Sequence, residues 1–294
     1  MSALKDKYVN PLTDFGFKKL FGSEPNKMLL IDFLNQVLPP KHRIKELKYA
    51  QNEHLGKTDL DRKAIFDLYC ISEEGERFIV ELQKAKQNFF KDRSVYYASF
   101  PIQEQAQKGE WDYKLSPVYM VGILDFIFDD HKNEQELLHT IELKNQRCEV
   151  FYDKLRFIYI ELPKFTKTEE ELETHFDKWL YVFRHLPNLE ERPKKLQEKV
   201  FQKLFEVAEI AKFTPEEQRA YEDSLKYYRD LKNVIDTSRE EGFLEGMQQG
   251  IQQGIEQGII KRNIEIAKKL KEKGMSISEI ATLTGLDESY IEKL

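Results

Sequence analysis

Three polar side chains interrupt an apolar stretch of the sequence, residues 65–86, that otherwise predicts a β-hairpin. Asp67 lies in the run IFDLYC, and Glu81 and Gln83 lie in the run FIVELQ. A polar group in a buried strand costs free energy unless it is paired. These three side chains are therefore candidates for a functional site within the sheet.

The turn of this hairpin predicts that the two acids face each other. The sequence SEEGE, residues 72–76, offers a three-residue loop in which Gly75 can adopt a positive φ. If the residues that flank the loop pair with each other, Asp67 lies directly opposite Glu81. Gln83 then lies one pleat further along the same face.

Strand alternation predicts the surroundings of the pair. Ile65, Asp67 and Tyr69 share one face in a regular strand, and Ile79 joins them from the neighbouring strand. These apolar neighbours favour a buried face. The alternative is that the face is solvated and the acids are ordinary surface residues.

The pair formed by Asp67 and Glu81 would suit a divalent cation. Two carboxylates at cross-strand distance repel each other and raise each other's pKa unless a cation lies between them. Mg²⁺ (or Mn²⁺) is the expected ion, because Mg²⁺ takes one or two carboxylates and completes its shell with water and phosphate. Such a site can stabilise the charge that develops during phosphodiester cleavage.

The elements that must position this pair predict a mixed α/β core. Helical spacing and apolar runs suggest a helix at 24–40, a strand near 43–53, the hairpin, a helix at 88–109 with a kink at Pro101, and strands at 116–128, 137–143 and 156–165. From residue 166 onward the pattern is entirely helical. We divide the chain into a core domain at 1–165, a helical extension at 166–240, a glycine-repeat helix at 241–262 and a tail at 263–294.

These residues resemble the PD-(D/E)XK nuclease fold, and most nearly its transposase-like branch, the recombination-promoting nucleases (Rpn). The stretches NPLTDFGFKKLFG, FIVELQ and RSVYYAS carry the resemblance over the first half of the chain. It implies a restriction-endonuclease-like mixed sheet flanked by helices, and a metal-dependent DNA endonuclease linked to recombination or mobile elements. Asp67 and Glu81 would be the metal ligands, and Gln83 would take the position of the signature lysine.

The sequence departs from the general nuclease pattern at Gln83, because glutamine can orient a water molecule but carries no charge. Arg93 on the next helix, and Lys18 with Asp14 four residues before it, are candidate contacts to phosphate or to the cleft. Lys84 is expected to point to the opposite face. The alternatives are that Arg93 is solvated and that Asp14 caps a helix.

Composition limits the function classes. The formal net charge is -6, so the protein has no overall positive field that would favour binding of nucleic acid. Cys70 and Cys148 lie in strand-like apolar surroundings, lack metal-ligand spacing and fit a reduced, cytoplasmic protein. No membrane-spanning segment is predicted. The histidines share no spacing, so we expect surface positions and no metal cluster; they are His42, His54, His131, His139, His175 and His185.

The carboxy-terminal region contains a repeat. Glycines recur every four residues from Gly242 to Gly258, each followed by an apolar residue. On a helix these rows form a groove beside an aliphatic ridge, which predicts a homo-oligomer, with a flexible linker as the alternative. The tail resembles a small helix-turn-helix with a capping box at Ser276 and Glu279 and a break at Gly274. Its last helix is acidic, which favours protein contacts at least as much as DNA.

Two functions remain open from the sequence. One is a Mg²⁺-dependent DNA endonuclease acting through Asp67, Glu81 and Gln83. The other is a catalytically weak or inactive nuclease-fold protein that acts as an oligomeric interaction module. The two acids favour the first function, whereas the missing lysine and the acidic net charge favour the second.

Overall fold

The computed structural model describes residues 6–50, 53–54, 64–106 and 112–294. The chain divides into two compact units, Met1–Lys232 and Asn233–Leu294. Among the described residues, no helix combines the length and the apolar character that crossing a membrane requires.

The first unit is built on a six-stranded mixed sheet with the strand order β1-β4-β5-β6-β8-β7. Its central strands β5, β6 and β8 run parallel, whereas the β1/β4, β4/β5 and β7/β8 pairs are antiparallel. The strands are β1 (Leu47–Tyr49), β4 (Leu68–Ser72), β5 (Arg77–Gln83), β6 (Val118–Leu124), β7 (Leu138–Lys144) and β8 (Val150–Glu161), and a separate pair consists of β2 (Glu53–His54) and β3 (Ala64–Ile65). Strand β6 is buried at every position, as parallel strands covered on both faces require.

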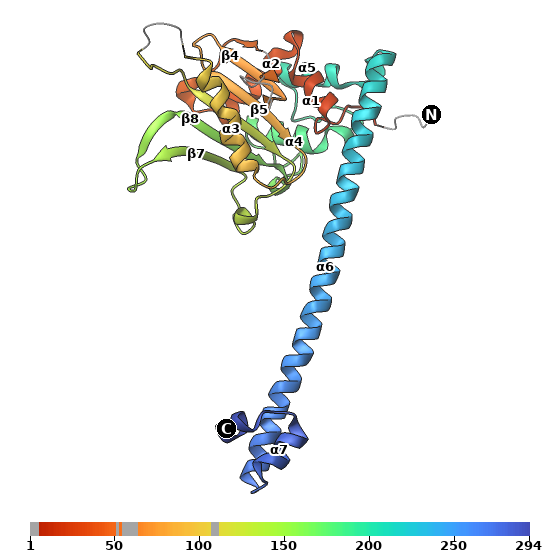
Figure 1. The fold of residues 1–294 in the computed structure, drawn as a ribbon. Helices are drawn as coiled ribbons and strands as arrows, with labels where there is room; N and C mark the ends of the chain where they lie inside the picture. The colour runs from red at the N-terminus through yellow and green to blue at the C-terminus, as the bar shows by residue number, and fades with distance from the viewer. Residues whose placement is uncertain (1–5, 51–52, 55–63, 107–111) are drawn as a thin grey trace. The chain divides into compact units, whose positions relative to one another are not determined.

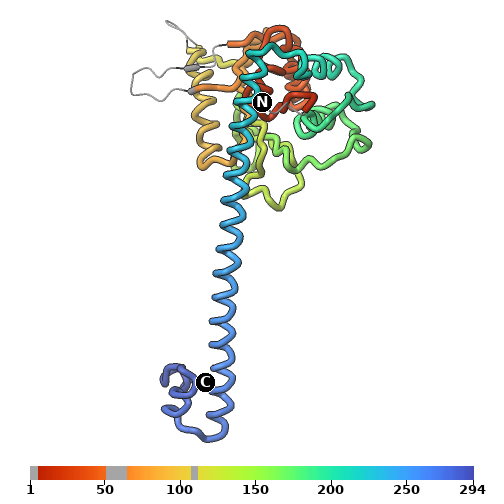
Figure 2. Tube along the Cα trace, turned by 90° about the vertical axis from the view of Figure 1, so that its right-hand side faces the viewer, coloured from red at the N-terminus to blue at the C-terminus, as the bar shows by residue number. Residues whose placement is uncertain are grey.

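Helices cover both faces of this sheet (Figures 1 and 2). Helix α3 (Phe90–Gln103) packs on one face, where its residues join a smaller apolar cluster with Tyr69 and Ile79. The opposite face carries the larger core and four helices: α1 (Asp14–Phe21), α2 (Lys27–Val37), α4 (His175–His185) and α5 (Lys199–Ala208). Trp179 lies at the centre of this core and donates its indole N–H to Asp32 at 2.7 Å. The expected mixed sheet flanked by helices is therefore confirmed.

Helix α6 (Pro215–Glu272) begins in the first unit, where Tyr221 and Leu225 are part of the core, and continues into the second. The second unit ends in a small apolar cluster formed by the end of α6, α7 (Ile277–Thr284) and α8 (Glu288–Glu292). The predicted capping box between Ser276 and Glu279 is confirmed, and Gly274 has the positive φ of a helix break. These local signals place the helix boundaries of the tail.

Two expectations are corrected here. Cys148 was expected in strand-like apolar surroundings, but it lies exposed in the turn between β7 and β8 with a positive φ. Only Cys70 is a buried strand residue, and both cysteines are free thiols. The strand expected near 43–53 is short, because β1 ends at Tyr49; residues 51–52 lie outside the described ranges.

Candidate active site

The hairpin forms with the predicted register. Leu68 pairs with Val80, and the Ser72 N–H donates to the Glu76 carbonyl at 2.9 Å, which closes the three-residue loop. Gly75 has a φ of +82°, as the turn requires. Continuing this register by one residue sets Asp67 opposite Glu81, although Asp67 lies in a bend just before β4.

Each acid bonds to the backbone of the other's strand. The Asp67 N–H donates to Glu81 Oε1 at 3.1 Å, and the Leu82 N–H donates to Asp67 Oδ2 at 2.7 Å. Each carboxylate is thus anchored by a backbone donor of the opposite strand, which restricts its orientation. The two acid side chains therefore meet at the hairpin instead of pointing to solvent.

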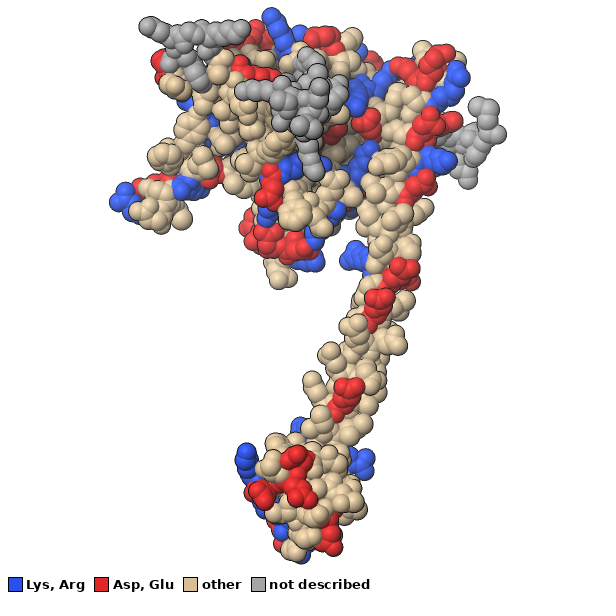
Figure 3. Space-filling model, in the orientation of Figure 1, with Lys and Arg blue, Asp and Glu red and all other residues tan. Residues whose placement is uncertain are grey.

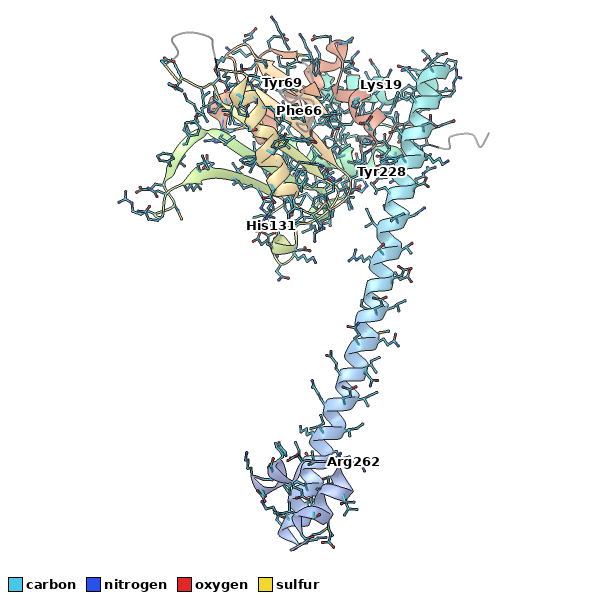
Figure 4. The ribbon with its side chains drawn as sticks, in the orientation of Figure 1. Lys19, Phe66, Tyr69, His131, Tyr228 and Arg262 are labelled. Carbon is cyan, nitrogen blue, oxygen red and sulfur yellow. The ribbon has the colours of Figure 1, made fainter. Side chains whose placement is uncertain are left out.

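The expected alternation around Asp67 is wrong. Ile65 is 61% exposed, whereas Phe66 is buried in the apolar cluster that contains Tyr69 on the α3 side of the sheet (Figure 4). The bend at Asp67 separates β3 from β4, so the strict period of two does not continue from one strand to the other. Glu81 is nevertheless buried and Asp67 half-buried, although Ile65 is exposed.

Burial makes this a pair of strongly perturbed carboxyl groups. Glu81 is only 5% exposed, and its burial, reinforced by the charge of Asp67, raises its pKa to about 8. Burial also raises the pKa of Asp67, and nearby Asp14 adds to that increase. The charges of Arg93 and Lys18 act in the opposite direction on Glu81. Without an added cation, Glu81 therefore holds a proton at neutral pH.

Arg93 brings a positive charge to Gln83. Its Nη2 donates to Gln83 Oε1 and its Nη1 to Gln87 Oε1, and the Gln83 amide donates to the Ala85 carbonyl at 2.8 Å. The guanidinium lies over the rings of Phe90 and Tyr97, at 5.1 and 5.5 Å from their centroids. Arg93 is thus held by the sheet and by its own helix, and it is not a freely solvated side chain.

Helix α1 contributes the candidate pair Asp14 and Lys18. Their side chains form an exposed ion pair at 3.0 Å, and both charges act on the pKa of Asp67. Thr13, not Asp14, caps the helix, because its hydroxyl accepts from the Gly16 N–H at 3.0 Å. A cleft of about 660 Å³ includes Asp14 and Lys18 in its walls, but its described lining does not include Asp67.

Lys84 was expected to point to the face opposite the acids, and its ammonium lies over the ring of Tyr227 on α6, 5.6 Å from the centroid. Its charge lowers the pKa of Asp67, and the charges of Asp14 and Asp67 in turn oppose the effect of burial on Lys84. Helix α6 contributes to the larger core, on the face of the sheet opposite α3, so the contact with Tyr227 agrees with that expectation. Lys86 instead pairs with Asp129.

The histidines contradict the expectation of scattered surface residues. His131 and His139 both contact Glu161, and these three residues form a group that could bind a metal ion. His175 contacts Asp32 at 2.6 Å and His42 contacts Glu76 at 2.7 Å, whereas the side chain of His54 lies outside the described residues. Sequence spacing could not reveal the group, but one signal was available: Glu161 interrupts the apolar run IYIEL as Glu81 interrupts FIVELQ.

The chemistry of Asp67 and Glu81 fits a hard divalent cation. Both ligands are carboxylates, both lose hydration by burial, and their mutual repulsion would be relieved by a positive ion between them. Mg²⁺ needs only one or two carboxylates when water and phosphate complete its shell. These residues therefore meet the requirement for such an ion.

The mixed sheet with parallel central strands, covered on both faces and carrying paired acids where β4 meets β5, is the architecture of a nuclease-fold protein. The chain belongs to the PD-(D/E)XK nuclease family transposases, whose family model matches residues 11–238. Neither the curated proteins nor the solved structures include a significant match to this chain.

Proposed function

We propose that this protein is a Mg²⁺-dependent DNA endonuclease, with Mn²⁺ as an alternative ion, that acts in recombination or on mobile elements. The observation that carries the proposal is the pair formed by half-buried Asp67 and buried Glu81, each anchored by a backbone N–H of the other's strand. The transposase description of the family supports DNA as the substrate. We place the activity in the cytoplasm, where Cys70 and Cys148 would remain thiols.

In this proposal Asp67 and Glu81 hold the cation, Arg93 contacts the phosphate, and Gln83 orients the attacking water. A bound divalent ion would supply Lewis-acid polarisation of the phosphate and neutralise developing charge. The Gln83 carbonyl positions the guanidinium of Arg93, which supplies the positive charge that a lysine at residue 83 would supply. Lys18 and Lys84 add positive charge beside Asp67, which favours a DNA backbone despite the acidic net charge.

The proposal is tested by plasmid nicking with added Mg²⁺ or Mn²⁺. We expect cleavage that depends on the ion, stops when a chelator is added, and requires the two acids. Cleavage that continues in the presence of excess chelator would contradict the proposal.

Replacing Arg93 by alanine should lower the nicking rate by about 10- to 100-fold, the range seen when groups that support a metal site are removed. The change leaves the Gln83 carbonyl without its charged donor and removes a cation that lowers the pKa of Glu81. Lys48→Ala, which removes an exposed cation from β1, is the matched control and should keep the wild-type rate. Equal rates for both variants would remove Arg93 from the mechanism.

A specific feature of α6 favours a second function, self-association. The residues that follow its last four repeat glycines, Met247, Ile251, Ile255 and Ile259, are between 49% and 57% exposed. A Cβ added at any glycine from Gly242 to Gly258 would meet nothing within 4 Å, so the groove is open. Figure 3 shows this part of α6 as largely uncharged, and residues 242–260 contain only two charged side chains.

We propose that a second copy of the same helix fills this groove. Each internal glycine costs about 1 kcal/mol relative to alanine, and close packing against a partner would offset that cost. The groove and the ridge lie side by side on one helix, so two copies can each insert a ridge into the other's groove. The oligomer would present the nuclease units together, or serve as an interaction module if catalysis is weak.

The Ile251→Glu/Ile255→Glu variant should halve the molar mass measured by light scattering if the wild type is a dimer, because buried charges would oppose the contact. Gln249→Glu/Gln253→Glu adds the same charge on the side of the helix opposite the ridge and should leave the mass unchanged. Self-association through α6 would be refuted if light scattering finds a monomer both for the wild type and for the protein truncated at Thr237.

A further inference from the structure

A second polar cluster lies at the same end of the parallel strands as Gln83. Gln83, Leu124 and Glu161 occupy paired positions on β5, β6 and β8, so Glu161 lies two strands away from Gln83 on the same face. At the usual strand spacing, the backbones of Gln83 and Glu161 are about 10 Å apart. The cluster is therefore separate from the acid pair, although both lie toward the same end of the parallel strands.

The centre of this cluster is Glu161, whose side chain is 0% exposed. Its Oε1 accepts from the Phe128 N–H at 2.7 Å and lies 3.2 Å from His131 Nδ1. Its Oε2 lies 3.1 Å from His139 Nε2 and 2.7 Å from Lys164 Nζ. The two imidazole rings stack with centroids 4.1 Å apart and an interplanar angle of 25°. His131 comes from the loop after β6 (Figure 4), and His139 comes from β7.

These distances suit a small divalent ion with nitrogen and oxygen ligands. Ligands about 2.0–2.1 Å from a tetrahedral ion lie roughly 3.3 Å from each other. One ligand atom from each of His131, His139 and Glu161 lies within 4.8 Å of the other two. The two nitrogen–oxygen distances, 3.2 and 3.1 Å, each involve a different oxygen of Glu161 and are both close to the tetrahedral value. The imidazole side chains are 17% and 13% exposed, so an ion can reach them from solvent.

The outer contacts of Glu161 match those of a ligating carboxylate. Such carboxylates are themselves hydrogen-bonded, which fixes the direction of their lone pairs. The Phe128 N–H and the Lys164 ammonium hold one oxygen each, so Glu161 cannot turn away from the histidines. Phe128 also packs against Tyr159 of β8, which holds the loop against the sheet.

We propose that His131, His139 and Glu161 bind one transition-metal ion of the Zn²⁺ class, distinct from the ion assigned to Asp67 and Glu81. Two imidazoles and one carboxylate select Zn²⁺ or Co²⁺ over Mg²⁺, which prefers oxygen ligands alone. The ion fastens the loop after β6 to β7 and β8. It takes no part in the proposed hydrolysis.

The test is calorimetric titration of the untagged, full-length Asp67→Asn/Glu81→Gln protein with Zn²⁺, since this background removes the carboxylate pair. We expect one equivalent to bind, and added His131→Asn or His139→Asn to weaken the binding by at least about 100-fold. His185→Asn on α4 is the control and should leave the affinity unchanged. Circular dichroism and melting curves establish that each variant is folded.

X-ray absorption of the Zn²⁺-loaded protein with both histidines intact provides a readout that does not depend on the variants. We expect two imidazole ligands and at least one oxygen ligand around the ion. Absence of saturable binding, equal affinity in folded histidine variants, or a spectrum without imidazole scattering would each overturn the proposal. Any of these results leaves the proposed nuclease unaffected, because its assay uses Mg²⁺ and Asp67.

Discussion

Plasmid nicking by the Asp67→Asn variant should fall by at least about 100-fold, and Glu81→Gln should cause a loss of the same order. Each change keeps the shape of the side chain and removes one of the two carboxylate ligands, so the ion is bound more weakly and is no longer fixed between the two strands. Supporting groups around metal sites contribute about 10- to 100-fold, and direct ligands should exceed that range. Initial rates of supercoiled plasmid loss at saturating Mg²⁺ and Mn²⁺ measure the effect.

The matched control for this prediction is Glu73→Gln. Glu73 lies in the exposed loop of the same hairpin, so the change removes the same charge without touching the acid pair. The control should nick at the wild-type rate. Persistent nicking by the Asp67→Asn and Glu81→Gln variants would show that the activity belongs to another centre or to a contaminant. Self-association through α6 would then be the function that remains.

Glu81→Gln should also make the metal-free protein more stable at pH 8, although it removes activity. The pKa of Glu81 is about 8 in the folded chain, against an ordinary value of 4.5. Between these two values the folded state keeps a proton that the unfolded state has lost, so the free energy of unfolding decreases as pH rises. Above pH 8 the cost of ionising the buried acid is complete, on the order of a few kcal/mol.

Urea unfolding in EDTA at pH 5 and pH 8 measures this effect. We expect nearly equal stability of wild type and Glu81→Gln at pH 5, and a higher midpoint for the variant at pH 8. Added Mg²⁺ should raise the wild-type midpoint at pH 8, because both acids must ionise to bind it, and should leave the variant unchanged. Glu73→Gln serves again as the control. A difference that does not grow from pH 5 to pH 8 would show that Glu81 is not perturbed.

The hairpin illustrates how far local sequence signals reach. Gly75 and the length of its loop predicted the register, because a tight turn leaves few ways to pair the strands that flank it. The same signals could not predict the bend at Asp67, which places Phe66 beneath α3 and leaves Ile65 exposed. That bend depends on packing against a helix that follows β5, and not on the propensities of residues 65–69.

The surroundings of the acids depend on contacts between distant segments. Arg93 was a candidate because of its place on the next helix. Its hydrogen bond to Gln83 forms only because α3 packs against the face of β5 on which the Gln83 side chain lies. Lys84 keeps the side that alternation predicts although β5 ends at Gln83, because its ammonium lies over Tyr227 of α6. His131, His139 and Glu161 were missed because pairing of β7 with β8 brings them together, and no fixed spacing records that pairing.

The order of helices and strands, the family, the paired acids and the caps of the tail could all be determined from the sequence. Each rests on interactions between residues close in the chain or on motifs with a fixed order. Only the tertiary structure determined which cations approach Asp67 and Glu81, how strongly burial perturbs them, and that a second cluster forms around Glu161. The physical reason is that desolvation and electrostatic coupling depend on which segments pack together, and that packing joins residues far apart in the chain.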